Sequence, residues 1–358
     1  MAFPTGWNRK CSLTIDHTKV SADQSNLPVL FTVDNLPSEM FDADGSYPAN
    51  SDGGDIRFSS DSAGATQLPV EVVYFLRDNT PANGLAEVWV NVTSVSSTVD
   101  TVVYVWYNNS SATMPAVTDT YGRNAVWSNS YKLVHHGNNT NNGDMTDATG
   151  NGWGTTAAAS YGSPYETTGV WSGGKALALV DIRGCAMVGG NTGITLPFSF
   201  EFWNYYNRAA NIWCGGIGQS SWDFNTANCT MNASDSGAWR LRVNNWGMQF
   251  TLTHPLQSWQ QVAVTYDGTN ALSYGSGTYH DTYNHTEASV NNTQQYYYGS
   301  NWDWTWPGYF DEVRVSTVVR SASWISSSYN SQNSPSTFIT EGTPASVGYA
   351  HSYVIWIG

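Results

Sequence analysis

The sequence has little positive charge, and this shortage excludes one class of partner. Its 14 lysine and arginine residues stand against 28 acidic residues, which gives a formal net charge of −14. The lysines lie far apart along the chain, at Lys10, Lys19, Lys132 and Lys175. Because affinity for a phosphate backbone depends on clustered basic side chains, we expect no nucleic-acid partner.

Cysteines and long apolar runs are also scarce. The four cysteines, Cys11, Cys185, Cys214 and Cys229, are too few for a disulfide framework and form no CxxC pair, so we interpret them as mostly buried thiols. A disulfide between Cys214 and Cys229 stays open, because sequence does not fix their separation.

No run of about 18 apolar residues occurs, so we expect no membrane insertion. Residues 1–9 lack a charged segment followed by an apolar stretch, so we expect no secretory signal peptide.

Aromatic and small polar residues are abundant instead. Aromatics make up 14% of the chain and charged residues 12%, with 17 tryptophans and 33 glycines, unlike a disordered acidic chain. The Ser, Thr, Asn and Gln side chains that must cover the surface favour strands and turns over helices. Alternating apolar residues, as in the stretches 88–92 and 103–107, have the period of a strand. We therefore predict an all-β fold.

The distribution of these strands predicts two β-sandwich domains. The first covers residues 1–115, and the second covers residues 116–343 as a larger sandwich. A short helix is predicted over residues 321–329, with Ser321 or Ser323 as its N-cap. Residues 344–358 form an apolar C-terminal tail, which we expect to be paired or buried. The strands predicted in the second domain span residues 175–180, 198–203, 238–243, 259–266 and 309–315.

Catalytic groups are not visible in these patterns. Glycoside hydrolysis needs two carboxylates on one face, about 5–9.5 Å apart. Glu201 has no acidic residue two or four positions away, and Asp311 and Glu312 are adjacent, which predicts opposite faces of a strand. We therefore predict a protein that is not an enzyme, although a carboxylate pair assembled from separate strands stays open. His135 and His136 alternate faces in the same way, and we interpret them as structural.

Tryptophan-rich segments are the candidates for ligand binding, because sugars bind to flat aromatic rings bordered by amides and hydroxyls. The alternating tryptophans of residues 302–306 share one face if extended, either as a platform for sugars or as part of the core. Tryptophans beside asparagine, such as Trp222 and Trp246, are better candidates because polar neighbours indicate a wet rim. The predicted carbohydrate-binding residues are Trp213, Trp222, Trp246, Trp302, Trp304 and Trp306.

Two parts of the chain resemble known families. The first third contains Gly6-Trp-Asn-Arg-Lys, Gly54-Asp-Ile-Arg-Phe and Ala86-Glu-Val-Trp-Val, and it resembles domain of unknown function 2341, an uncharacterised β-sandwich. The remainder contains Phe198-Ser-Phe-Glu-Phe-Trp and Phe310-Asp-Glu-Val-Arg-Val-Ser, and it is similar to laminin-G-like, concanavalin-A-like jelly rolls. The second resemblance implies a lectin-like jelly roll.

The resemblance to these jelly rolls also implies a structural calcium ion. Such domains often hold calcium between an early loop and the last core strand, which here corresponds to Asp147, in a loop rich in oxygen ligands that includes Asn151, and to Asp311. In the alternative interpretation, Asp147 and Asn151 cap turns, and Asp311 pairs with Arg314 or with backbone donors.

The tandem of the two domains resembles virion proteins of tailed bacteriophages. This resemblance implies a location on the virion surface, contact with other virion proteins and binding of a host-surface glycan. We also expect homo-oligomers, formed by strand addition through the apolar residues 353–357. The competing hypotheses are a capsid decoration or structural protein without glycan binding, and a bacterial cell-surface adhesin.

Overall fold

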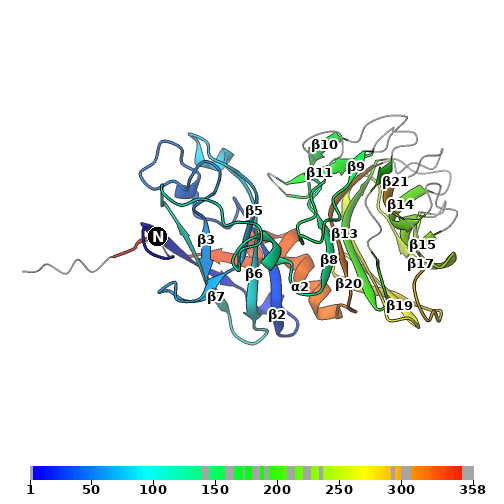
Figure 1. Cartoon of the computed structure of the whole chain (residues 1–358). Coiled ribbons are helices and arrows are strands. Elements are labelled where there is room, and N and C mark those ends of the chain that lie inside the picture. Colours follow the sequence, from blue (N-terminus) through cyan, green and yellow to red (C-terminus); the bar gives the residue numbers. More distant parts are fainter. Residues whose placement is uncertain are drawn as a thin grey trace, which may run out of the picture.

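The chain folds into two lobes built from β-strands, with only a few short helices (Figure 1). The computed structural model describes residues 3–138, 145–157, 165–171, 174–179, 186–188, 193–207, 214–220, 227–233, 237–291, 295–299 and 308–348. The predicted all-β class is confirmed. No helix within these ranges is long and apolar enough to cross a membrane.

The first lobe is a sandwich of two antiparallel sheets. One sheet has the strand order β23-β1-β7-β3-β4, with β24 also beside β1, and the other has the order β2-β6-β5. Alternation along β6 places Val88, Val90 and Val92 in the core between the sheets, as a strand period of two requires. The strands are β1 (Arg9–Ile15), β2 (Gln24–Thr32), β3 (Arg57–Ser59), β4 (Gln67–Leu68), β5 (Val70–Leu76), β6 (Leu85–Val95), β7 (Thr101–Tyr107), β23 (Ile339–Glu341) and β24 (Ala345–Ser346).

The C-terminal part of the described chain returns to this first sheet. Strand β23 pairs with β1, with Ile339 opposite Ile15, and β24 pairs with the start of the same strand, with Ser346 opposite Arg9. Residues 339–346, which the sequence assigns partly to the second domain and partly to the tail, thus complete the first sandwich. The segment 353–357, predicted to join subunits, lies outside the described residues.

The second lobe is a larger sandwich. Its sheets have the orders β10-β11-β22-β13-β18-β19-β20, with β8 also beside β22, and β17-β16-β15-β14-β21-β12-β9. Its core contains Phe198, Phe200 and Phe202 from alternate positions of β13. The predicted strands at 238–243 and 259–266 are confirmed at both ends. The strands are β8 (Tyr131–His135), β9 (Thr156–Ala157), β10 (Tyr165–Thr168), β11 (Lys175–Ala178), β12 (Ala186–Val188), β13 (Phe198–Tyr206), β14 (Cys214–Ser220), β15 (Ala227–Ala233), β16 (Ala238–Val243), β17 (Trp246–Thr253), β18 (Trp259–Tyr266), β19 (Asn270–Gly275), β20 (Thr278–Asn284), β21 (Gln295–Gly299) and β22 (Gly308–Ser316).

The main helix lies between the two lobes (Figure 1). Helix α2 (Ala322–Asn333) begins after Ser321, whose hydroxyl accepts a hydrogen bond from the Trp324 backbone N–H at 3.1 Å. The predicted helix is therefore confirmed, with the first of the two proposed N-caps. Two short helices are α1 (Arg123–Val126) and α3 (Pro335–Phe338), and single 3₁₀ turns are η1 (His17–Lys19), η2 (Ser38–Met40) and η3 (Pro81–Asn83).

The lobes meet through a continuous apolar contact. Trp89 of β6 lies with its ring centroid 5.5 Å from Trp127 and 6.2 Å from Trp171, both of which come after the first sandwich in the sequence. Trp324 of α2 and Ala263 of β18 belong to the same buried cluster as the first core. Large apolar side chains buried in one contiguous cluster lose most of their water contact, so the lobes stabilise each other.

Two of the four cysteines are buried thiols, as the sequence predicts. Cys11 and Cys229 are buried free thiols. Across the β14–β15 hairpin Cys214 lies opposite Ala233, whereas Cys229 lies opposite Gln219. The disulfide between Cys214 and Cys229 that the sequence leaves open is therefore not formed.

Candidate functional site

One of the predicted carbohydrate-binding tryptophans lies within the described residues. Trp246 is the first residue of β17, and its side chain is exposed, with 51% of the residue accessible to solvent. Trp246 lies two and four positions before Met248 and Phe250, which are buried in the core. Side chains two positions apart on a strand share a face, so Trp246 lies on the inner face of the sheet, beyond the edge of the core. The other predicted tryptophans, which lie outside the described residues, are Trp213, Trp222, Trp302, Trp304 and Trp306.

A tight turn holds Trp246 in this place. Asn244 and Asn245 connect β16 to β17 with φ angles of 47° and 70°. A two-residue hairpin turn of type I′ requires positive φ at both positions, and asparagine tolerates that conformation better than most residues. Val243 pairs with Trp246 directly across the turn. The Asn-Asn-Trp-Gly sequence therefore sets the position of the ring.

The Trp246 ring stacks on His285, with the ring centroids 4.7 Å apart and the planes inclined by 9°. His285 Nε2 lies 2.8 Å from Glu287 Oε1, and the Asn244 amide donates to Glu287 Oε2 at 2.9 Å. Asn244 Oδ1 in turn accepts a hydrogen bond from the Asn291 backbone N–H at 2.8 Å. These bonds tie the segment after β20 to the β16–β17 turn and fix the orientation of the stacked rings.

The stacked rings lie beside a negative charge. Partial burial disfavours the charged form of Glu287, but hydrogen bonds from Asn244 and His285 outweigh it and lower the pKa of this carboxyl group. The side chains of His285 and Glu287 are 21% and 22% exposed. The hairpin tip thus presents an aromatic face next to a carboxylate and amides, a combination suited to the apolar faces and hydroxyls of a sugar.

Asp147, predicted to bind calcium, is a buried residue that organises its own loop. Its carboxylate accepts hydrogen bonds from the backbone N–H groups of Val134, Thr149 and Trp153. Asn151 donates its amide to a backbone carbonyl of β8 at 3.0 Å. These contacts are those of residues that cap turns, which was the alternative interpretation.

The third predicted calcium residue, Asp311, lies in β22. Its carboxylate accepts hydrogen bonds from the backbone N–H groups of Val170, at 3.1 Å, and Glu312, at 2.8 Å. Within the described part of the chain, no group of three or more closely spaced His, Cys, Asp or Glu side chains includes Asp147 or Asp311. The assignment of calcium to Asp147, Asn151 and Asp311 stays a prediction.

A group of ionisable residues lies buried between the lobes, and the sequence did not reveal it. His136 follows β8, and its Nδ1 lies 2.6 Å from Glu312 Oε1 of β22 and 3.3 Å from Glu87 Oε1 of β6. Its Nε2 lies 3.2 Å from Glu71 Oε2 of β5. Arg314 of β22 donates to the second oxygen of Glu312 at 2.5 Å. We call these five side chains the interlobe cluster.

A β-bulge brings Glu312 into the interlobe cluster. Glu201 of β13 lies opposite Arg314, whereas Trp203 lies opposite Asp311, so β22 has one residue more than β13 in this interval. Glu312 adopts a φ of 49°, in the left-handed region. The alternation that predicts opposite faces for Asp311 and Glu312 is therefore interrupted at this position.

The interlobe cluster is a set of carboxylates assembled from separate strands, which the sequence leaves open. Glu87 is 0% and Glu312 1% exposed, and the Arg314 guanidinium lies 4.3 Å from the Trp89 ring centroid. A cavity of about 260 Å³ beside the cluster is lined by Glu71 and His136, by the polar side chains of Arg123, Asn138 and Thr146 and by apolar residues; Glu87 and Glu312 do not line it. A polysaccharide cannot reach the closely spaced carboxylates of Glu87 and Glu312.

The comparisons with known proteins concern the second lobe. Residues 187–326 match the family model of the concanavalin A-like lectin/glucanases superfamily. This part of the second lobe is thus similar to concanavalin A-like domains. No curated protein matches the sequence. The resemblance of the first lobe to domain of unknown function 2341, and that of the tandem to phage proteins, stay predictions.

Solved structures resemble the chain only weakly. Domain 4 of AbnA, a GH43 extracellular arabinanase from Geobacillus stearothermophilus, in complex with arabinotriose, has a TM-score of 0.45 and 16% identity, over 56% of this chain and 98% of that one. The binding domain of botulinum neurotoxin DC in complex with SialylT has a TM-score of 0.42 and 13% identity, over 57% of this chain and 52% of that one. The chain thus spans about half the length of that toxin domain. Likeness at this level says nothing about the ligand of this chain.

The two adjacent histidines have separate surroundings, as predicted. Inside the second lobe, His135 Nδ1 lies 2.7 Å from the Tyr298 hydroxyl, and burial lowers the pKa of His135 to about 4. His136 is directed to the interlobe cluster instead. Burial disfavours its charged form, but the carboxylates of Glu312 and Glu71 outweigh this and raise the pKa of His136 well above its usual value.

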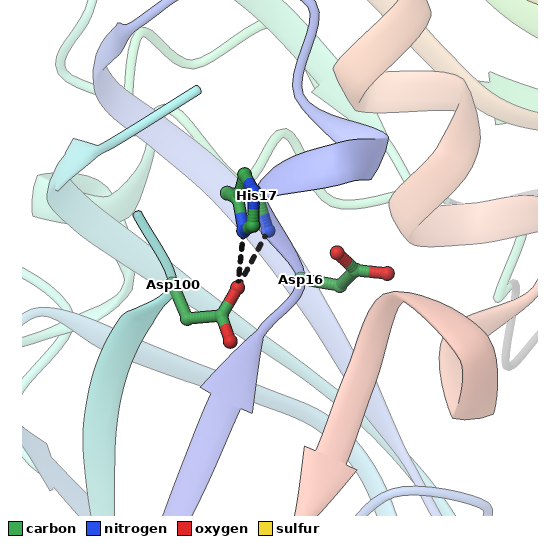
Figure 2. Close-up of side chains that lie close together, drawn as sticks. All are labelled: Asp16, His17 and Asp100. Atoms are coloured by element: carbon green, nitrogen blue, oxygen red, sulfur yellow. Dashed lines mark hydrogen bonds and ion pairs between the residues drawn. The ribbon is translucent and has the colours of Figure 1, made fainter. Parts of the chain in front are cut away.

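Besides the interlobe cluster, a second group of closely spaced acidic and histidine side chains lies on the first lobe. Asp100 Oδ1 lies 2.6 Å from His17 Nδ1. Asp16 accepts a hydrogen bond from the Thr18 backbone N–H at 2.8 Å and so caps the turn η1. Figure 2 shows the Asp100 carboxylate facing His17 and the Asp16 carboxylate turned away from it. Capping of η1 and one surface ion pair account for this group.

Proposed function

We propose that the chain binds carbohydrate through its concanavalin A-like domain, at the hairpin tip that carries Trp246. The single observation that carries this proposal is the exposed Trp246 ring, held in place by stacking on His285. An exposed aromatic face covers the apolar face of a pyranose, and the adjacent Glu287 carboxylate accepts hydrogen bonds from sugar hydroxyls. Because the ring is already ordered, little conformational entropy is lost when a ligand binds.

We propose that this binding is not coupled to catalysis. Hydrolysis needs a carboxylate pair that a sugar can enter. Among the described residues, the carboxylates of Glu71, Glu87 and Glu312 meet from separate strands, but they are buried between the lobes. Asp16 and Asp100 also lie close together, but they are engaged by Thr18 and His17. Near Trp246, Glu287 is the carboxylate in contact with the stacked rings, and it is engaged by Asn244 and His285.

We further propose that the protein is displayed on the surface of a tailed-bacteriophage particle and contacts glycans of the host surface. The resemblance of the first third and of the domain tandem supports this proposal. The net charge of −14 and the scarcity of lysine suit an exposed protein that does not contact the packaged nucleic acid. In this arrangement the first lobe contacts other virion proteins, and copies associate through the tail.

Binding of the purified full chain to a glycan array tests the carbohydrate proposal. We expect Trp246→Ala to lose binding by about 30-fold, since truncating a central aromatic contact costs roughly 2 kcal/mol. Tyr279→Ala is the matched control, because Tyr279 is 52% exposed and lies at the far end of β20 from His285. Circular dichroism and thermal melting show whether both variants remain folded.

The outcomes of this experiment separate the candidate functions. Binding that is lost in Trp246→Ala and kept in Tyr279→Ala supports a carbohydrate site at the hairpin tip. A wild-type chain that binds no glycan favours a decoration protein with a mechanical role. Equal binding by wild type and Trp246→Ala moves the site away from this hairpin.

Immunogold electron microscopy with an antibody to the chain tests the location. We expect label on intact phage particles. Label on the surface of uninfected bacteria, and none on particles, would favour the adhesin hypothesis.

Measuring the mass in solution tests association through the tail. The full chain is compared with a chain ending at residue 348, and two identical monomer masses contradict the association.

A further inference from the structure

We propose that the interlobe cluster binds one divalent transition-metal ion, with Glu87, His136 and Glu312 as its ligands. The ligand atoms of these three residues lie within 4.8 Å of one another. Glu87 comes from the first sandwich, whereas His136 and Glu312 come from the second lobe. A bound ion would therefore link the two lobes directly. This inference does not depend on carbohydrate binding.

The distances at His136 Nδ1 are close to those of a metal site. Bonds of about 2.0–2.2 Å to a tetrahedral ion place neighbouring ligand atoms about 3.2–3.6 Å apart. Glu87 Oε1 already lies 3.3 Å from His136 Nδ1. Glu312 Oε1 lies 2.6 Å from the same nitrogen, so this carboxylate has to withdraw by less than about 1 Å when an ion enters.

The side chains behind the three ligands hold them in place. His136 Nε2 faces Glu71 Oε2 at 3.2 Å, and a histidine that binds metal through one nitrogen usually donates its other N–H to a carboxylate. The Trp89 indole donates to Glu87 Oε1 at 3.1 Å. Together with Arg314, which donates to the second oxygen of Glu312, the Glu71 carboxylate and the Trp89 indole hold all three ligands from outside.

One oxygen of Glu87 points independently to a missing ligand. Glu87 is fully buried, and its Oε2 atom has no hydrogen-bond partner. A buried carboxylate oxygen without a partner is costly, because the water it leaves is not replaced. A cation bound by the Glu87 carboxylate would offset this cost.

The composition of the cluster favours a transition metal over calcium. An imidazole nitrogen with two carboxylates suits zinc, manganese, iron or cobalt, whereas calcium prefers six to eight oxygens. Three carboxyl groups, those of Glu71, Glu87 and Glu312, surround the His136 ring, and Arg314 contacts one of them. A divalent ion bound here displaces any proton that its ligand atoms hold.

Refolding of the full chain tests the proposal. The chain is unfolded in denaturant with a chelator, refolded with Co²⁺ alone or Zn²⁺ alone, and dialysed before elemental analysis. We expect one metal equivalent per wild-type chain and the visible absorption of coordinated Co²⁺. Glu87→Gln keeps the shape of the side chain and is expected to retain less than about a tenth of this metal, because the amide oxygen is a poor ligand.

Asp100→Asn is the matched control, because it alters the acidic group around His17 on the surface. We expect this variant to retain the full equivalent. A wild-type chain that refolds without retaining metal overturns the proposal, and so does metal that is lost in Asp100→Asn but kept in Glu87→Gln. If Glu87→Gln does not refold, electron paramagnetic resonance of the Cu²⁺-loaded wild-type and His136→Gln chains decides. Coupling of Cu²⁺ to a histidine nitrogen that is present in wild type and lost in His136→Gln supports the interlobe site, and coupling that is absent from wild type or unchanged in the variant overturns it.

Discussion

The exposed pair His285–Glu287 and the buried pair His136–Glu312 have similar geometry and different surroundings. At the hairpin tip, His285 and Glu287 lie 2.8 Å apart, with side chains 21% and 22% exposed. Between the lobes, His136 and Glu312 lie 2.6 Å apart, with side chains 4% and 1% exposed. Water solvates the first pair whether or not it forms, whereas the second pair is shielded from water. The same residue types can therefore contact a ligand at the exposed hairpin tip, whereas between the lobes they connect one lobe to the other.

The largest effect is expected when the buried pair is broken. Glu312→Ala removes the carboxylate that faces both His136 and Arg314 and leaves two buried cationic groups without it. We expect the free energy of unfolding to fall by about 3–5 kcal/mol, the usual cost of removing one partner of a buried ion pair. Urea unfolding followed by circular dichroism measures this change. A loss below about 1 kcal/mol would mean that the pair behaves like a surface pair.

Truncating a tryptophan in each region sharpens the comparison. Trp89→Ala removes the ring that contacts Trp127, Trp171 and Arg314, and we expect a loss of about 3–5 kcal/mol. Trp246→Ala removes an exposed ring, and we expect a change within about 0.5 kcal/mol. Both values come from the same denaturant titration. Similar losses for the two variants would contradict the assignment of Trp246 to a ligand surface.

A half-buried histidine, His254, is expected to make the stability of the fold depend on pH. His254 packs against Tyr206, with ring centroids 3.8 Å apart, and burial lowers the pKa of His254 to about 4. Below its usual pKa of about 6.5 the unfolded chain binds a proton that the folded chain does not, so stability decreases as the pH falls from about 6.5 toward 4. Unfolding at several pH values should show a smaller decrease in His254→Gln than in wild type. An equal decrease in stability in wild type and His254→Gln would show that another titratable group causes the pH dependence.

The smallest effect is expected at the exposed pair. Glu287→Gln removes the charge beside His285 and keeps an oxygen that can accept a hydrogen bond. Because exposed ion pairs contribute about 0–1 kcal/mol, we expect the free energy of unfolding to change by less than about 1 kcal/mol. The same urea titration measures it. A loss as large as that of Glu312→Ala would remove the distinction between the two regions.

Features set by neighbouring residues could be predicted from the sequence. The alternating apolar residues of 238–243 and 259–266 predicted strands with the observed ends, and Ser321 was identified as the cap of α2. The Asn-Asn-Trp-Gly motif indicated an exposed tryptophan, and Trp246 is exposed. Periodicity and turn chemistry act over a few residues, so one sequence contains enough information for them.

Features that depend on distant residues could not be predicted. Glu71, Glu87, His136 and Glu312 come from four separated segments, and no spacing in the sequence relates them. The available signal was a carboxylate inside an apolar strand, as at Glu87 between Ala86 and Val88. The bulge at Glu312 interrupts the alternation on which a sequence argument depends. The stacking of His285 on Trp246 likewise requires the packed fold.

The central claim is that the exposed ring of Trp246 recognises a sugar, whereas the buried pair belongs to the cluster that joins the lobes. The direct test is the dissociation constant for an array-selected glycan, measured by titration calorimetry with wild type and Trp246→Ala at one temperature where both are folded. We predict an affinity at least about 10-fold lower for Trp246→Ala, with an unchanged melting temperature. An unchanged dissociation constant contradicts the claim.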